Sequence, residues 1–397
     1  MGNWFAAITS DVSQSLALAE IGALLLVLGV AAFIAVRIKF SVVPFYLLIG
    51  LALGKGGFFP LDLSESFLNT GAQLGAILLL LMLGLEHSGP DLAAGFLERK
   101  SVGAIDFAVN AIPGAIIGFL LGWGVLGAIV LGGITYVSSS GIASQMMKET
   151  GWQRSEVSRR VVTVLVLEDL TLAPYLPLLT TLVAGAGAIA GFLSVAVAIL
   201  VTGLALLLAF KGENALGKAL NTQAQGGLLL TVFGAALFAA GSAELVGFSS
   251  AVAAFLVGLA LSGEVAFAVR LRLAPLRDLF AAIFFLFFGL SIAPAEMIAV
   301  FPLALLLAAL GVAGKMYVGW NIARDMSDGN AWKRAGAFLI PRGEFSIVIA
   351  GLAATTSFGG QLQALTITYV LLTSIAASIA LRYFRSSFEK ARAKKKS

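Results

Sequence analysis

The sequence of 397 residues contains no cysteine and a single histidine, His87. The lack of cysteine excludes disulfide bonds, thiolate nucleophiles and cysteine metal sites, and one histidine excludes a site built from a histidine cluster. Charge is also scarce, because Asp, Glu, Lys and Arg make up 12% of the residues, whereas soluble domains carry about 25%. No nucleophile–base pair and no metal-ligand cluster stands out. We therefore expect no enzyme, no cofactor and no nucleic-acid partner.

What the sequence does contain is apolar: 59% of the residues are hydrophobic and the mean hydropathy is +0.98. Since a membrane span needs about 20 mostly apolar residues, apolar segments along the whole length predict an all-α polytopic membrane protein. The candidate spans number about thirteen: 16–36, 40–57, 68–87, 101–121, 124–147, 158–183, 187–210, 226–243, 247–263, 273–293, 297–320, 331–355 and 363–384.

Positive charges test this count, because Lys and Arg gather on the cytoplasmic side of a membrane. They follow the odd-numbered spans, as with Arg37 and Lys39 after the first span, and Lys55 is the exception. The pattern predicts an outside N-terminus and a cytoplasmic C-terminus in a lipid bilayer, expected to be the bacterial plasma membrane. Residues 1–384 then form the transport domain, and 385–397 form a basic cytoplasmic tail.

An internal repeat divides the chain. Residues 40–54 (FSVVPFYLLIGLALG) match 248–262 (FSSAVAAFLVGLALS) at seven of fifteen positions, and 74–85 parallel 279–290 at nearly the same offset. The two copies, about 40–183 and 247–384, begin seven spans apart, so they face opposite ways in the bilayer. Inverted repeats are typical of secondary transporters, which bind their substrate between the repeats.

Two spans carry residues that break helices. Ser138, Ser139 and Ser140 interrupt the fifth span within TYVSSSGIASQ, and the twelfth contains the run PRGE at 341–344. Unwound backbone at membrane depth is tolerated only inside protein or beside water. The serines can bind a cation, or can simply allow close helix packing. For Arg342 and Glu344 we favour a structural role, at helix ends or as an ion pair, over a role as transport ligands.

Charged residues also lie deep in the spans. Asp169 follows Glu168 and is nine residues beyond Arg160, roughly 14 Å along a helix and so near the middle of the bilayer. Lys315 is equally deep and is expected to pair with one of these acids. Asp106 can face this polar core or reach the cytoplasmic interface, and Asn110 is expected to face the core. Ionisable groups at such depth are costly and are usually functional.

Two adjacent carboxylates in a low dielectric cannot both be ionised cheaply. A bound cation or a bound proton lowers that cost, so cation and proton compete for the same group, and alternating access then exchanges one for the other. If Lys315 stays charged, one proton exchanges per cation; if Lys315 also releases its proton, two exchange. The sequence permits either ratio.

The motifs resemble the Kef-type branch of the second monovalent cation:proton antiporter family along nearly the whole chain. The matching stretches are LGAILLLLMLGLEHS, YVSSSGIASQMMKETG, LVLEDL, FSSAVAAFLVGLALSG and PRGEFSIVIAGLA. The resemblance implies a sodium/proton antiporter-like fold of thirteen helices with two crossed broken helices and a homodimer. It implies that Asp169 binds the monovalent cation and the proton, beside Glu168, and that Lys315 is the family's buried lysine.

Two departures from Kef systems leave the choice of K⁺ or Na⁺ open, although the resemblance favours K⁺. This chain has Glu-Asp where Kef systems often have Gln-Asp, and Arg-Gly-Glu where they often have Gly-Gly-Glu. The tail is expected to contact anionic lipid, with docking of a separate cytoplasmic regulatory subunit as the other possibility. Two other functions remain open: a sodium-coupled symporter of an organic anion that uses Arg342, and a Kef-like gated cation efflux channel.

Overall fold

The computed structural model describes residues 2–38, 42–54, 57, 65–86, 89–152, 155–185, 225–245, 250–261 and 263–384, and all regular elements in these ranges are helices. They are α1 (Gly2–Arg37), α2 (Val42–Leu53), α3 (Glu65–Glu86), α4 (Gly89–Gly118), η1 (Phe119–Trp123), α5 (Gly124–Tyr136), α6 (Ser140–Thr150), α7 (Glu156–Val183), α10 (Gln225–Leu245), α11 (Ser250–Ala260), α12 (Gly263–Leu290), α13 (Pro294–Ala323), α14 (Ala331–Leu339), α15 (Glu344–Leu352) and α16 (Gly359–Tyr383).

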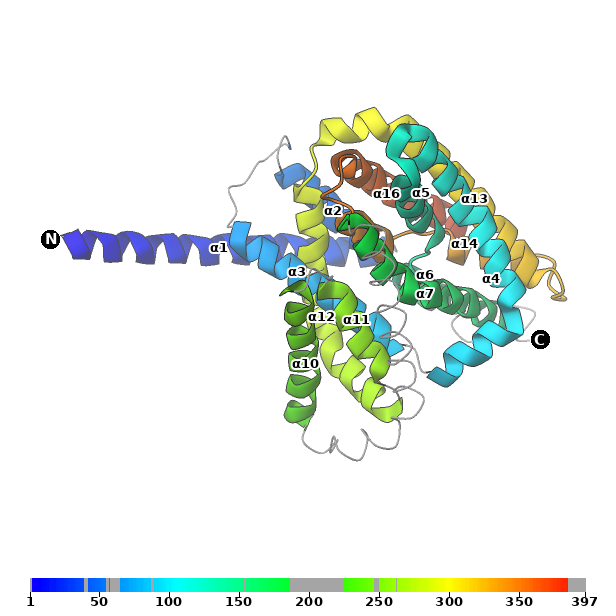
Figure 1. The fold of residues 1–397 in the computed structure, drawn as a ribbon, viewed down its shortest axis with the longest axis horizontal. Helices are drawn as coiled ribbons and strands as arrows, with labels where there is room; N and C mark the ends of the chain where they lie inside the picture. The colour runs from blue at the N-terminus through cyan, green and yellow to red at the C-terminus, as the bar shows by residue number, and fades with distance from the viewer. Residues whose placement is uncertain are drawn as a thin grey trace.

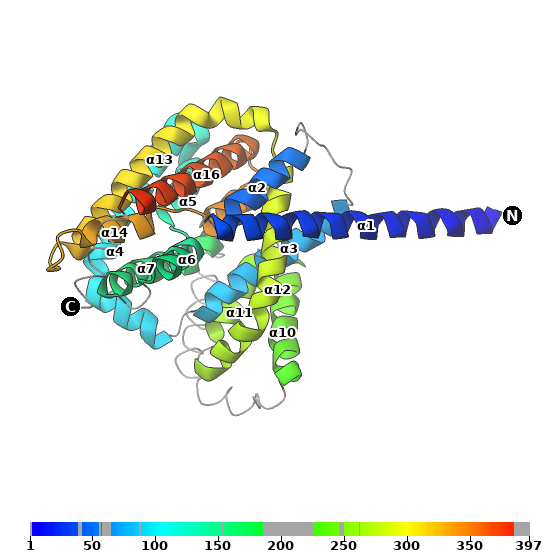
Figure 2. The same ribbon diagram turned by 180° about the vertical axis from the view of Figure 1, so that it is seen from behind.

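The helices form two groups, seen in Figures 1 and 2. In one group α12 packs against α2 and α3, α3 packs against α11, and α11 packs against α10. In the other group α4 packs against α5, α7 and α13, and α13 packs against α14 and α16. Helix α1 packs against α2 and projects away from both groups at its N-terminal end. This second group also includes α6, which packs against α7 and α14, and α15, which packs against α5 and α16. It therefore contains every predicted site residue.

The all-α membrane fold is confirmed. Among the described residues seven helices are long and apolar enough to cross a membrane, and α2 and part of α3 are shorter apolar helices. Helices or pairs of half-helices coincide with the predicted spans, except that the span 187–210 lies outside the described residues, as do His87 and the tail 385–397. The predicted total of thirteen therefore stays a prediction.

Several helices extend beyond the predicted spans, whose apolar parts at 18–37 and from 101 onward agree with the prediction. Helix α1 begins at Gly2 and not near residue 16, α4 begins at Gly89 and not near 101, and α12 begins at Gly263 and not near 273. Hydropathy marks only the part of a helix that lies in hydrocarbon, whereas its backbone hydrogen bonds continue into water. Arg99 and Lys100 therefore lie within α4, not in a loop, and Arg270 and Arg272 lie within α12.

The internal repeat gives rise to two equivalent helix crossings, one between α2 and α12 and one between α3 and α11. A Cβ atom added to Gly50 on α2 would lie 2.3 Å from the Leu286 carbonyl oxygen on α12, where Gly289 faces it. A Cβ atom added to Gly84 on α3 would lie 2.3 Å from the Phe255 carbonyl oxygen on α11, where Gly258 faces it. By the sequence offset Gly50 corresponds to Gly258 and Gly84 to Gly289, so the two crossings are equivalent. Only glycine lets the backbones approach so closely.

Candidate functional site

Two broken helices cross at the centre of the second group, as expected. Helix α5 ends at Tyr136 and α6 begins at Ser140, while α14 ends at Leu339 and α15 begins at Glu344. The Ser139 amide donates to the Pro341 carbonyl at 2.8 Å, and the Ser138 hydroxyl donates to the Leu339 carbonyl at 2.9 Å. Each unwound segment therefore provides hydrogen-bond partners for backbone groups of the other segment inside the protein.

Arg342 neutralises the carboxyl ends of two half-helices. Its guanidinium donates to the Thr135 carbonyl at 2.9 Å, near the end of α5, and to the carbonyls of Leu339 and Ile340 at 3.2 and 2.9 Å, at the end of α14. The arginine is fully buried. Carbonyls at a helix end carry partial negative charge, so a buried cation here compensates both dipoles and supports the structural role that we expected for Arg342.

Glu344 has the complementary position. It is the first residue of α15, and its carboxylate accepts a 2.7 Å hydrogen bond from the Ser139 hydroxyl. Ser139 lies just before α6, and its oxygen also accepts from the Ile142 amide at 3.2 Å, as an N-cap does. A carboxylate thus sits where the amino ends of α6 and α15 meet, and Ser139 serves as a cap.

Lys315 lies between two acids. Its Nζ is 2.7 Å from Asp106 Oδ1 on α4 and 2.9 Å from Glu168 Oε1 on α7, and all three side chains are buried. The prediction that Lys315 pairs with one acid of the Glu168–Asp169 pair is confirmed for Glu168. The second partner, Asp106, faces the polar core and does not reach the interface.

Glu168 is also held by the first break. The Ser138 amide donates to its carboxylate, and the Ser138 hydroxyl oxygen, whose shorter hydrogen bond goes to the Leu339 carbonyl, lies 3.2 Å from Glu168 Oε1. Asp169 is the next residue on α7 and is buried, with 3% of its surface exposed. Of the other predicted site residues, Ser140 is half-buried as the first residue of α6. The predicted carboxylate pair and the serine break therefore meet at one place.

Asn110 connects the lysine cluster to the crossing. The side-chain NH2 group of Asn110 donates to Asp106 Oδ1 at 2.9 Å, and its side-chain oxygen Oδ1 accepts from the Arg342 guanidinium at 3.3 Å. The sequence carried a signal for this link, since Asp106 and Asn110 are one helical turn apart and share a face. Hydropathy alone did not decide which way that face pointed.

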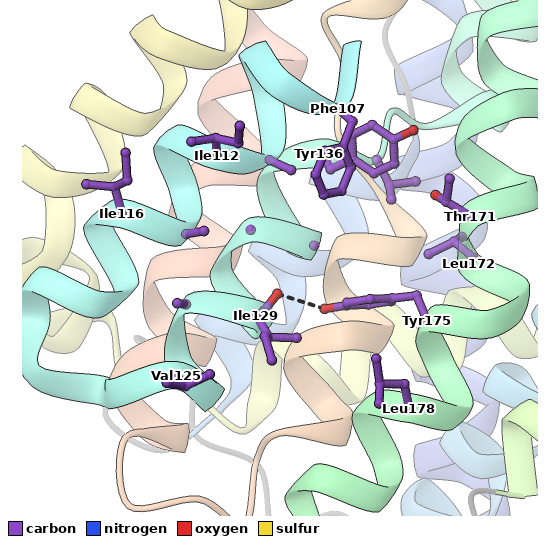
Figure 3. A pocket seen from close by; sticks show the side chains of 16 residues that line it. Phe107, Ile112, Ile116, Val125, Ile129, Tyr136, Thr171, Leu172, Tyr175 and Leu178 are labelled. Atoms are coloured by element: carbon purple, nitrogen blue, oxygen red, sulfur yellow. Dashed lines mark hydrogen bonds between the residues drawn. The ribbon is translucent and has the colours of Figure 1, made fainter. Parts of the chain in front are cut away.

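An apolar cavity of about 490 Å³ lies between α4, α5 and α7 (Figure 3). The Tyr175 hydroxyl, in its wall, donates to the Ile129 carbonyl at 3.1 Å. Tyr136 forms another part of the wall, and its ring centroid is 5.6 Å from Lys315 Nζ. None of the predicted ion-binding residues lines the cavity, so Tyr136 separates the apolar space from the charged cluster.

Comparison with known proteins now assigns the family. Residues 22–384 match the family described as sodium/hydrogen exchanger, transmembrane. The chain belongs to this family. The resemblance to Kef-type antiporters is confirmed, as is the predicted class of function, exchange of a cation for protons across a membrane.

Individual relatives of this exchanger agree with that assignment. This chain is 29% identical to the K(+)/H(+) antiporter subunit KhtU of Bacillus subtilis, over 91% of this chain and 92% of KhtU. It is 29% identical to the ammonium/H(+) antiporter subunit AmhT of Alkalihalophilus pseudofirmus, over 94% and 95% of the two chains. It is 31% identical to the glutathione-regulated potassium-efflux protein KefC of Salmonella arizonae, over 92% of this chain and 60% of KefC.

The fold has a solved counterpart. The sodium proton antiporter MjNhaP1 of Methanocaldococcus jannaschii is similar with a TM-score of 0.68 at 17% identity, over 94% of this chain and 97% of MjNhaP1. This likeness supports the antiporter-like fold with its inverted repeats and crossed broken helices.

Proposed function

We propose that this exchanger carries K⁺ against H⁺, and that the Glu168–Asp169 carboxylate pair is the group for which the two ions compete. The observation that carries the proposal is the placement of this pair against the unwound Ser138 segment and Lys315, in the buried core of the second helix group. The name of the relative KhtU, a K(+)/H(+) antiporter subunit, supports K⁺ as the working ion.

In this mechanism Asp169 is the main ligand of both the cation and the proton. Glu168 lies beside it and accepts hydrogen bonds from the Ser138 amide and from Lys315. Ser138 places a hydroxyl oxygen 3.2 Å from the Glu168 carboxylate, and such an oxygen is a ligand that a monovalent cation accepts in place of water. Because a proton or a cation lowers the cost of the buried negative charge, each one displaces the other, and access alternates only when that charge is reduced.

Arg342 and Glu344 hold the crossing and do not bind the transported ion. Arg342 donates to carbonyls at two helix ends, and Glu344 accepts from Ser139. This arrangement disfavours the alternative of an organic-anion symporter, because the buried guanidinium has its donors directed at Thr135, Leu339, Ile340 and Asn110.

Proton flux in proteoliposomes tests the proposal. Purified protein is reconstituted with a pH-sensitive dye inside, and K⁺ or Na⁺ is added outside in turn. We expect K⁺ to drive proton movement in the wild type and Asp169→Asn to abolish it. Asp278→Asn is the matched control, since Asp278 is an exposed aspartate that pairs with Arg277 away from the site.

Three results would contradict the proposal in different ways. Undiminished flux in Asp169→Asn would move the site to another carboxylate. Proton movement on addition of Na⁺ but not of K⁺ would identify Na⁺ as the transported cation. Cation flux that ignores the pH gradient would favour the gated channel over the carrier.

We also propose the setting in which this exchanger works. The protein is an integral membrane protein, and we place it in a bacterial plasma membrane with the N-terminus outside, as a homodimer. The exposed apolar side chains of α1, including Leu26, Val30 and Phe33, offer a surface that lipid or a second copy can cover. A separate cytoplasmic regulatory subunit would be detected by co-purification with the tail 385–397, and cysteine cross-linking along α1 would detect the dimer.

A further inference from the structure

The apolar cavity between α4, α5 and α7 opens on the outer surface of a membrane span. At its mouth Ile116 on α4 and Val125 on α5 are 53% and 69% exposed. Both belong to the stretch Ser101–Ser144, which is long and apolar enough to cross a membrane. The medium that meets the mouth is therefore the hydrocarbon of the bilayer and not water.

The walls of the cavity provide few partners for water. The hydroxyls of Thr171 and Tyr175 already donate to the backbone carbonyls of Glu168, at 2.6 Å, and Ile129, at 3.1 Å. A buried water needs several polar partners, and an apolar cavity without them stays dry and accepts apolar ligands. The volume of about 490 Å³ also lies within the range of about 300–1,000 Å³ that ligand pockets occupy.

The cavity has the length of one leaflet of a bilayer. It extends from Val125, close to the turn between α4 and α5, to Phe107 and Tyr136 at its inner end (Figure 3). The rise of α5 from Val125 to Tyr136 is roughly 16 Å, and half of the hydrocarbon core is roughly 15 Å thick. Trp123, at the turn, is a residue type that is enriched at membrane interfaces. The cavity therefore follows the path of an acyl chain from the interface to the middle of the bilayer.

The inner end of the cavity adjoins the charged cluster without being part of it. The rings of Phe107 and Tyr136 meet edge to face with 5.4 Å between their centroids. The Tyr136 ring is 5.6 Å from Lys315 Nζ, and Phe107 follows Asp106 on α4. An occupant of the cavity therefore packs against helices that carry the cluster, and aromatic rings separate it from the charges.

We propose that this cavity is a binding site for the acyl chain of a phospholipid, which enters from the leaflet at the η1 end of α5. The chain supplies contacts that the walls of an empty cavity would lack, and it fills the space between α5, α4 and α7. In the part of the chain that the structure describes, no charged side chain lines the cavity, so the site selects the hydrocarbon chain and not the headgroup. The inference goes beyond the proposed function and holds for either transported cation.

Photo-crosslinking tests the site. Purified protein is reconstituted in phosphatidylcholine vesicles that include a phosphatidylcholine with a diazirine at the end of one acyl chain, and mass spectrometry locates the adducts after illumination. We expect wall adducts, meaning adducts on the buried lining residues Tyr136 and Leu172. Surrounding lipid labels exposed side chains such as Tyr317 on α13 and serves as the internal reference. Adducts confined to exposed side chains, because a second copy or another segment covers the mouth, would overturn the inference.

A variant with a filled cavity gives the second arm. Ala128 on α5 lines the cavity, and Ala128→Leu places a larger side chain in the path of the acyl chain. We expect this variant to lose the wall adducts and to keep those on Tyr317. The matched control is Ala235→Leu, at an exposed alanine of α10, which should keep both. Wall adducts that persist in a folded Ala128→Leu, or that disappear equally in Ala235→Leu, would contradict the site.

Two further measurements keep the test decisive. If size-exclusion chromatography shows that Ala128→Leu does not fold, Ala115→Leu fills the cavity from α4, and the wild-type wall adducts are evidence on their own. A phosphatidylglycerol with the same diazirine chain should give the same wall adducts, because the walls carry no charge. Wall adducts with phosphatidylglycerol only would indicate a headgroup site and overturn the selection of the acyl chain.

Discussion

The Ser139 hydroxyl donates a hydrogen bond of 2.7 Å to the Glu344 carboxylate. The two residues are 205 positions apart in the chain, which is the offset that relates the two repeats. Each residue lies at the point where its own repeat resumes a helix after the break. The two breaks are therefore joined by residues in corresponding positions. The same correspondence holds approximately for Asp106 and Lys315, which are 209 residues apart on α4 and α13.

Removing the hydroxyl of Ser139 should loosen the crossing without changing the exchange ratio. Ser139→Ala loses the N-cap of α6 and the donor to Glu344, and loss of a cap costs about 1 kcal/mol. We expect a lower melting temperature in detergent and unchanged coupling between cation and proton. Ser139→Thr, which keeps the hydroxyl, is the control. A Ser139→Ala protein that is as stable as the wild type would contradict the capping role.

Lys315 and Glu168 should differ in how strongly their neutralisation destabilises the protein. Glu168→Gln leaves Lys315 paired with Asp106, whereas Lys315→Met leaves two buried carboxylates without their cation. Breaking a buried ion pair in this way costs about 3–5 kcal/mol, so we expect a severe loss of stability in Lys315→Met and a much smaller one in Glu168→Gln. Thermal unfolding followed by size-exclusion chromatography compares them, and equal losses would contradict the shared-lysine arrangement.

Arg342 should not be replaceable by lysine. The planar guanidinium donates at once to carbonyls at the ends of α5 and α14, while an ammonium group is a single compact charge. We expect Arg342→Lys to lower both the melting temperature and the transport rate, and Arg324→Lys, a change on an exposed arginine, to leave both unchanged. Wild-type transport by Arg342→Lys would show that charge alone suffices at this position.

The pH should change the cation affinity in a defined direction. Because cation and proton bind the same carboxylate, each tenfold fall in proton concentration should lower the apparent KM for K⁺ by up to about tenfold, until the carboxylate no longer holds a proton. The affinity thus weakens as pH falls. Initial rates at a series of pH values measure this, and an apparent KM that does not vary with pH would mean separate sites for the two ions.

The paired glycines should resist substitution. A Cβ atom on Gly258 would lie 2.3 Å from the Leu81 carbonyl oxygen, whereas one on Gly234 of α10 meets nothing within 4 Å. We expect Gly258→Ala to separate α3 from α11 and lower stability, and Gly234→Ala to be neutral or to gain up to about 1 kcal/mol from helix propensity. Melting temperatures of the two variants decide, and similar values would contradict the close crossing.

The sequence was informative wherever a residue type conflicted with its surroundings. Serines, proline and charges in apolar runs predicted both breaks and the pairing of Lys315 with an acid, because such residues are tolerated at membrane depth only when the fold satisfies them. The assignment of transport roles to Glu168, Asp169 and the serines stays a prediction. The sequence does not decide the direction of Asp106, because a charge close to the start of an apolar span can point inward or toward the interface. Its direction depends on the packing of α4 against α13, which periodicity along one helix does not contain.

The glycine crossings have a consequence for how the molecule is built. Each one joins a helix of the first repeat to a helix of the second, α2 to α12 and α3 to α11. Neither repeat makes this contact within itself. The two halves are thus related as the subunits of a dimer whose interface has been fused into one polypeptide, and the glycine pair Gly50–Gly289 of one crossing has its counterpart in the pair Gly258–Gly84 of the other.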